Sequence, residues 1–80
     1  LATKFAARMR PNAETSIDQA IENAYQFAIG RPASDTEKTT MFNFIEHQKS
    51  LRADKENAEE LAVQDFCQLI LCLNEFLYIE

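Results

Sequence analysis

The chain contains little glycine and proline, and this limits the folds it can adopt. Its 80 residues include one Gly, two Pro, one His and no Trp. β-Sandwiches and barrels need a turn residue about every 8–12 positions, and phosphate-binding loops are rich in glycine. The apolar content of 46% is typical of a packed globule. We therefore expect a single small all-α domain over residues 1–80.

Acidic residues outnumber basic ones, and the two kinds are unevenly distributed. The net charge is -5, and residues 54–80 carry seven acids and one base, whereas the first ten residues carry three bases and no acid. Nucleic-acid binding needs clustered Lys and Arg, so we expect no nucleic-acid partner. The apolar stretch 66–79 is shorter than the roughly 20 residues that span a membrane, so we expect no membrane insertion either.

The cysteine and histidine pattern does not predict a metal, cofactor or catalytic site. Cys67 and Cys72 are five residues apart, about 7.5 Å along a helix axis, which is too far for a mutual disulfide. The single histidine, His47, gives no zinc-ligand spacing. We expect both cysteines to be small buried apolar residues and His47 to lie on the surface. Ser16 and Ser34 fit helix caps better than nucleophiles. The predictions are no cofactor and no enzyme activity for this chain.

Apolar spacing and end signals predict four helices. Ser16 and Gln19 have the spacing of a capping box, and so do Ser34 and Glu37. Gly30 can supply the left-handed residue that ends a helix. The predicted helices cover residues 1–10, 16–29, 34–50 and 56–79, with a polar linker over 51–57. The last helix is apolar nearly all round over 66–73, so we expect it in the middle of a small four-helix bundle.

Aromatic side chains are expected to fill most of the core. Each aromatic side chain buries about 150–250 Å² when it lies inside a protein. The expected core aromatics are Tyr25, Phe27, Phe42, Phe44, Phe66 and Phe76.

Two segments carry a resemblance to a known family. Residues 25–37 (YQFAIGRPASDTE) begin with an aromatic residue and continue through a Gly-Arg-Pro corner into a capping box. Residues 65–79 (DFCQLILCLNEFLYI) end in the specific motif Asn-Glu-Phe-Leu-Tyr-Ile. Together with Phe5-Ala-Ala-Arg8, they resemble the C-terminal part of a planctomycete-type bacterial domain of unknown function. The family often has Trp where Val63 stands and Asn where Cys72 stands.

The resemblance implies a parent protein but no activity. Domains of that family close large multidomain proteins that often begin with a cytochrome c-like module, so the resemblance implies an exported or periplasmic bacterial parent. The chain also begins at Leu1 in the middle of an apolar pattern and without Met, and we expect it to be a piece of a longer protein. No family residue role carries over to named positions.

Arg31 and Glu75 form the most informative charged pair in the sequence. Arg31 follows the helix-ending Gly30 and precedes Pro32, and Glu75 interrupts the most apolar segment beside Asn74. A lone buried charge is costly unless it is paired. We predict a partly buried salt bridge between Arg31 and Glu75, completed by Asn74. The alternative is an anion- or substrate-binding Arg31 with Glu75 as an acid or base.

Two functions follow as expectations. The first is a non-catalytic packing and interaction module that docks against neighbouring domains of its parent protein; alone, the chain would expose an apolar patch or form a homodimer through it. The alternative is a small-molecule or carbohydrate-binding domain that contributes to a hydrolase-like site. The residues expected to form the structural motif or to surround that site are Gly30, Arg31, Pro32, Ser34, Glu37, Asn74, Glu75 and Tyr78.

Overall fold

The computed structural model describes the backbone of residues 2–79 and the side chains of residues 3–73. All the regular elements of residues 2–79 are helices: α1 (Ala2–Met9), α2 (Ile17–Ala28), α3 (Asp35–Leu51) and α4 (Ala58–Ile79). The prediction of a small all-α four-helix bundle is therefore confirmed. The helix ends fall within about two residues of the predicted ones.

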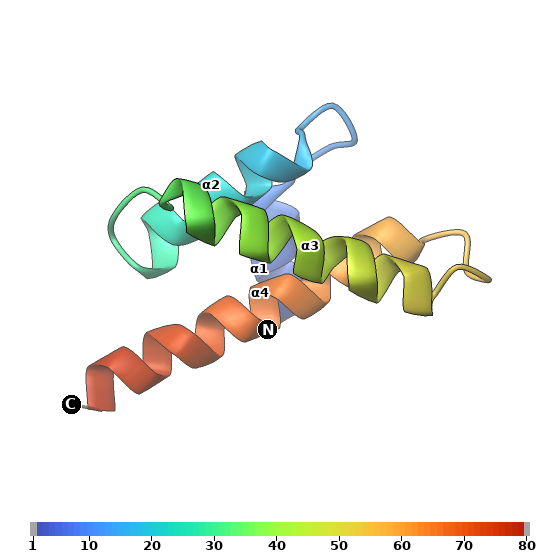
Figure 1. Cartoon of the computed structure of the whole chain (residues 1–80). Coiled ribbons are helices and arrows are strands. Elements are labelled where there is room, and N and C mark those ends of the chain that lie inside the picture. The colour runs from blue at the N-terminus through green and yellow to red at the C-terminus, as the bar shows by residue number, and fades with distance from the viewer. Residues whose placement is uncertain (1, 80) are drawn as a thin grey trace.

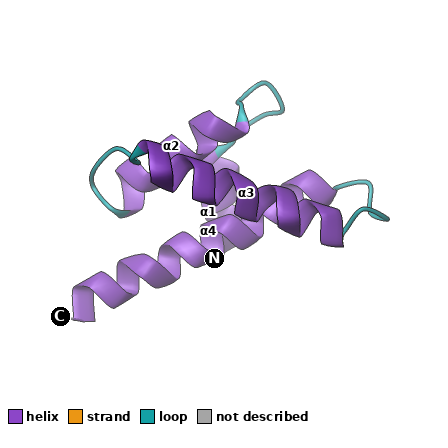
Figure 2. Ribbon diagram, in the orientation of Figure 1, coloured by secondary structure: helices purple, strands orange, loops and turns teal. Residues whose placement is uncertain are grey.

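The helices are arranged around α4. The α2 and α3 helices form an antiparallel hairpin, and α4 runs back below α3 (Figure 1). The α1 helix lies behind α3 in this view, and the loops lie apart from one another on the periphery of the body (Figure 2). The α4 helix packs against each of the other three. The first part of the stretch predicted to be central is buried, at Phe66, Cys67 and Ile70. For its end the prediction was wrong, because Cys72 and Leu73 are exposed.

Polar side chains fix the starts of α2 and α3. The Ser16 hydroxyl accepts a hydrogen bond from the backbone N–H of Gln19, and the Ser34 hydroxyl accepts one from the backbone N–H of Glu37. At Ser34 the box is complete, because its backbone N–H also donates to the Glu37 carboxylate. At Ser16 the prediction of a complete box was wrong. The Gln19 amide donates to Asn23 instead, one turn further along the helix.

The end of α2 confirms the predicted role of the single glycine. Gly30 has a φ of 84°, a left-handed conformation that side chains with a Cβ rarely adopt. Its N–H and that of Ile29 both donate to the carbonyl of Tyr25, which satisfies a carbonyl at the end of the helix. The chain can therefore turn sharply into Arg31 and Pro32.

One apolar core joins the four helices. Phe66, Cys67 and Ile70 of α4 are fully buried, and they pack with Ile21 of α2 and Ile45 of α3. Burial of a large aliphatic or aromatic side chain contributes about 1.5–3 kcal/mol. The remaining buried side chains of this cluster are Phe5, Ala6, Met9, Ala24, Tyr25, Ala33, Ala62 and Val63.

Three side chains expected inside are exposed. Phe27 is 57% exposed and Phe42 is 39% exposed, because each is about 90° or more around its helix from the centre of the buried stripe. Cys72 is also exposed, since it lies about 160° around α4 from Ile70. Tyr25, Phe66 and Cys67 are buried as predicted. Phe44 is partly buried against the core, and Phe76 lies outside the described side chains.

Candidate functional site

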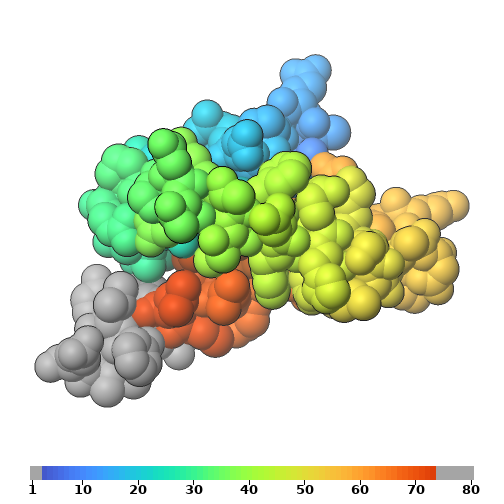
Figure 3. Space-filling model, in the orientation of Figure 1, coloured from blue at the N-terminus to red at the C-terminus, as the bar shows by residue number. Residues whose placement is uncertain are grey.

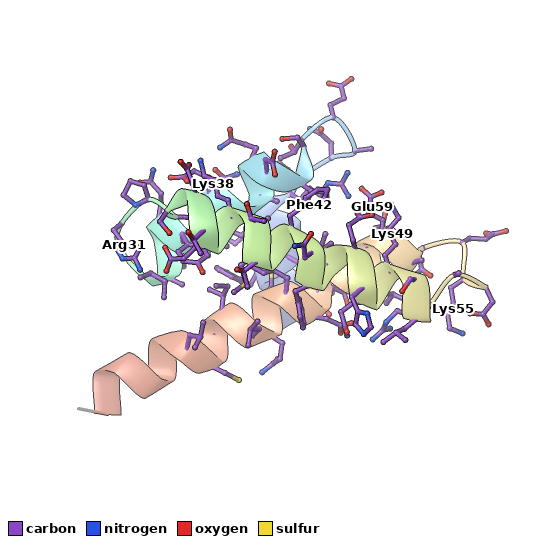
Figure 4. All side chains as sticks on the ribbon, viewed as in Figure 1. Arg31, Lys38, Phe42, Lys49, Lys55 and Glu59 are labelled. Atoms are coloured by element: carbon purple, nitrogen blue, oxygen red, sulfur yellow. The ribbon has the colours of Figure 1, made fainter. Side chains whose placement is uncertain are left out.

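The Gly-Arg-Pro corner between α2 and α3 is the most strongly marked polar feature of the sequence. Arg31 projects from this corner at the end of the α2–α3 hairpin (Figure 4). Its Nη1 donates to the Pro32 carbonyl at 3.0 Å and to Glu37 Oε1 at 2.7 Å. Its Nη2 donates to Glu37 Oε2 at 2.8 Å. The guanidinium therefore binds the carboxylate in a bidentate way through two parallel hydrogen bonds, the geometry in which Arg–carboxylate pairs are strongest.

Glu37 joins this ion pair to the start of α3. Its Oε1 also accepts from the backbone N–H of Ser34 at 2.9 Å. The pKa of Glu37 is lowered to about 2. The hydrogen bond from Arg31 is the largest cause, and the hydrogen bond from the Ser34 backbone N–H lowers the pKa further. The same hydrogen bond raises the pKa of Arg31. Glu37 therefore stays ionised at neutral pH and is poorly suited to act as a general acid or base.

Buried and partly buried groups hold the corner against α2. The Arg31 guanidinium carbon lies 5.9 Å from the centroid of the Tyr25 ring. Burial raises the pKa of Tyr25, and the charge of Glu37 raises it further. The backbone N–H of Ala33 donates to Glu22 at 3.3 Å, and Lys38 lies 3.7 Å from the same carboxylate oxygen. These contacts close the corner around its own groups and give it a structural role.

The residues predicted to act together with Arg31 lie near the end of α4. Asn74, Glu75 and Tyr78 belong to the last turns of α4, but their side chains lie outside the described residues. Arg31 itself is half exposed, at 52% of its side chain, and Glu37 occupies its guanidinium. The Arg31–Glu75 pair stays a prediction, and so does the cleft around those residues.

A shallow groove lies elsewhere, between α1, the loop after it and the first half of α4. It has a volume of about 340 Å³. Thr3 and Gln64 meet across it at 3.5 Å. Arg10 lines one side of it, but its Nε donates to the Thr15 carbonyl and its Nη2 lies 2.6 Å from Glu59. This cation therefore holds the loop and α4 in place, and Arg31 does not line the groove.

The side chains that could bind a metal ion or act in catalysis are dispersed over the described part of the chain. Among the side chains of residues 3–73, no three His, Cys, Asp or Glu groups come together as a metal site. His47 is exposed, as predicted. Burial raises the pKa of the Cys67 thiol to about 12, so at neutral pH this thiol has almost no thiolate. Cys72 is exposed and contacts Gln68 at 3.5 Å. Both thiols are free in this structure.

A second ion-pair cluster, not predicted from the sequence, ties α3 to α4. Asp65 of α4 accepts from Arg52 Nη2 at 2.9 and 3.1 Å and from the Gln48 amide at 3.1 Å. Nearby, Lys49 bridges the same two helices by approaching Glu59 at 3.6 Å, and these two side chains lie side by side near the α3–α4 loop (Figure 4). Nothing in the local sequence spacing signals these contacts, because their partners are 10–17 residues apart.

The surface exposes several large apolar side chains. Besides Phe27 and Phe42, Leu51 is 65% exposed and Leu73 is 39% exposed. Leu73 lies on the same side of α4 as the buried Ile70, about 60° around the helix. The apolar stripe of α4 therefore continues past the part that the other helices cover. On the viewed face, α3 crosses the middle of the body, and the described part of α4 that is coloured orange-red lies below it (Figure 3).

Comparison with known proteins gives no assignment for these features. No protein-family model matches the chain. No curated protein and no solved structure is significantly similar to it. None of the helices in the described part of the chain is long and apolar enough to cross a membrane.

Proposed function

We propose that this domain is a non-catalytic helical packing and interaction module. It would dock against neighbouring domains of a larger protein, and by the motif resemblance that parent would be an exported bacterial protein. The observation that carries the proposal is the exposure of Phe27. A phenylalanine that is 57% exposed keeps a large apolar surface in water, and aromatic side chains of this kind are enriched in protein interfaces.

The chemistry of the described residues favours the same proposal. The polar groups of the Gly-Arg-Pro corner bind one another, and its carboxylate is held ionised by Arg31. The one described cysteine that is fully buried is a poor nucleophile, because its pKa is raised. A catalytic site needs an acid, base or nucleophile next to a suitable partner and a cavity. The corner and the buried thiol do not offer that combination.

The proposal is tested by the solution behaviour of the chain alone. Sedimentation velocity would measure its association state, and the fluorescence of the dye ANS would report exposed apolar surface. We expect the wild type to bind ANS or to dimerise, and Phe27→Gln together with Leu73→Gln to reduce that behaviour. Leu51→Gln, which changes an exposed apolar residue near the α3–α4 loop, is the matched control. A monomer that binds no ANS would contradict the proposal.

A second candidate function is supported by the groove between α1 and α4. Its volume of about 340 Å³ is within the range of about 300–1,000 Å³ for small-molecule sites, and Thr3 and Gln64 offer hydrogen-bonding groups. Such a small-molecule or carbohydrate site would lie away from Arg31, where the sequence suggested it. A screen of mono- and disaccharides by thermal shift would test it, with Gln64→Leu as the variant that should lose any shift.

A further inference from the structure

One surface combines positive charges with Phe27, the most exposed aromatic side chain among residues 3–73. Phe27 of α2 lies over α1, where its ring centroid is 5.6 Å from that of Phe5 with an angle of 52° between the rings. The guanidinium carbon of Arg8 lies 4.8 Å from the Phe27 centroid. Lys4 precedes Arg8 by one helical turn, so the two cations share one side of α1. We call Lys4, Arg8 and Phe27 the basic–aromatic patch.

The positive charge of the patch is not used inside the described part of the domain. Arg10, the third cation of this region, pairs with Glu59 at 2.6 Å. In contrast, neither Lys4 nor Arg8 forms an ion pair or side-chain hydrogen bond with the described side chains of residues 3–73. Both are exposed. Among the described side chains, the patch therefore presents two cations without an acidic partner, on a protein whose net charge is -5.

The position of Arg8 suits recognition of a carboxylate beside an apolar group. An arginine that rests on an aromatic face keeps its N–H donors in the plane of the guanidinium, where they can bind a carboxylate in a bidentate way. The exposed part of the Phe27 ring can then receive an apolar side chain next to that carboxylate. Two cations are too few for a nucleic-acid site, which depends on many phosphate contacts.

We propose that the basic–aromatic patch binds an acidic, apolar segment of another polypeptide, in which Asp or Glu stands next to a large apolar residue. This inference rests on the proposed interaction function and gives it a surface and a partner chemistry. The argument is one of complementarity: carboxylates of the segment neutralise Lys4 and Arg8, and its apolar side chain covers Phe27. Aromatic and arginine side chains are also the residues that most often dominate binding energy at interfaces.

A random dodecapeptide library displayed on phage tests the proposal with the whole chain as bait. We expect the selected peptides to be enriched in Asp or Glu adjacent to Leu, Ile or Phe. Synthetic copies of the selected peptides should bind to Arg8→Gln and to Phe27→Ala with a Kd at least about fivefold higher than to the wild type. This corresponds to a loss of about 1 kcal/mol or more in binding free energy, which is typical of an interface hot spot. Their affinity should also fall as salt rises.

The control variants make the same kinds of change, loss of a positive charge and loss of an apolar side chain, at positions outside the patch. Lys55→Gln removes an exposed cation in the α3–α4 loop (Figure 4), and Leu51→Ala removes an exposed apolar side chain. Both should bind the selected peptides like the wild type. Circular dichroism of all four variants establishes that they are folded, which is expected because the changed side chains are exposed.

Each other result overturns the inference in a distinguishable way. Selected peptides that lack acids, or that bind Arg8→Gln and Phe27→Ala normally, would place the docking surface elsewhere and leave the interaction function standing. Failure to select peptides, together with self-association that Phe27→Ala abolishes, would make a second copy of this chain the occupant. Failure to select peptides from a chain that stays monomeric and binds no ANS would reject both the patch and the interaction function.

Discussion

Arg31 and Glu37 lie on either side of the α2–α3 corner and join their side chains by two parallel hydrogen bonds of 2.7 and 2.8 Å. The same carboxylate accepts from the backbone N–H of Ser34. One side chain therefore caps α3 and also binds the arginine that follows α2. This double use links the end of one helix to the start of the next.

Glu37 should make the stability of the domain depend on pH in the acid range. Its pKa is lowered from the ordinary value of 4.5 to about 2, chiefly by Arg31. A carboxylate with a lowered pKa in the folded state stabilises the fold above the unfolded pKa, and that contribution is lost as pH falls towards the folded pKa. Thermal unfolding of the wild type and Glu37→Gln at several pH values would measure this. The difference in Tm should be present at pH 6 and shrink between about pH 4.5 and pH 2; a constant difference would contradict the assignment.

The partner of Arg31 can be identified by a thermodynamic cycle. In Arg31→Ala, Glu37→Gln and the double variant, the losses should not be additive, because either single change already breaks the bidentate pair. The same cycle with Glu75→Gln tests the pair predicted from the sequence. Non-additivity with Glu75 as well would show that Arg31 contacts both carboxylates, whereas additivity there would reject the Arg31–Glu75 pair. The measurement is the Tm of each variant at neutral pH.

The two serine caps should differ in their importance. Loss of a Ser, Thr, Asn or Asp cap costs about 0.5–2 kcal/mol. Ser34→Ala should lie towards the upper part of this range, since Ser34 belongs to a complete box, and Ser16→Ala towards the lower part, because Gln19 does not complete its box. Urea denaturation of both variants checks the order. Equal losses would show that the box adds little to the single cap.

Substitution of Gly30 should destabilise the fold because of its backbone conformation and not because of a steric clash of the new side chain. Its φ of 84° is strained for other residues, yet an added Cβ would meet nothing within 4 Å. Gly30→Ala should therefore cost about 1–2 kcal/mol through the left-handed conformation alone. Gly30→Asn is the matched control and should cost less, because Asn adopts this region more readily. Chemical denaturation gives both values, and a neutral Gly30→Ala would contradict the geometry of the corner.

The two thiols should react at very different rates. Cys72 is exposed, whereas Cys67 is fully buried and its pKa is raised to about 12. With the thiol reagent DTNB at neutral pH, the folded chain should release one equivalent quickly and the second only when it unfolds. In Cys72→Ser the fast phase should disappear. A fast reaction in that variant would mean that the helices around Cys67 open easily.

Local signals predicted the helix ends better than they predicted helix faces. The box at Ser34 and the turn at Gly30 depend on residues within a few positions, so their spacing in the sequence was sufficient. The faces of α2 and α3 depend on where the other helices lie. Phe27 and Phe42 are apolar residues at the edges of their stripes, and their exposure follows from the direction in which α1 and α4 pack.

The α2–α3 corner shows that local sequence signals also predicted the contacts of charged groups incompletely. The sequence pattern predicts a capping role for Glu37 and a distant partner for Arg31, although only six residues separate Arg31 from Glu37. The signal was available in the sequence, because a corner that ends one helix and begins the next brings such residues together. By contrast, the contacts of Asp65 with Arg52 and Gln48 have no local signature. They depend on the crossing of α3 over α4.

The central position of α4 has a consequence for the order in which the chain folds. The α2–α3 hairpin brings together segments that are close in sequence, so its loop closes at a small cost in entropy. The α1 helix instead packs on α4, which follows it by about 50 residues in the sequence. During synthesis, Phe5 and Met9 must therefore wait for Val63, Phe66 and Ile70 before they have a common core. A chain that stops at residue 57 would leave in water the apolar surfaces of α1, α2 and α3 that α4 covers, in a form open to proteases and chaperones.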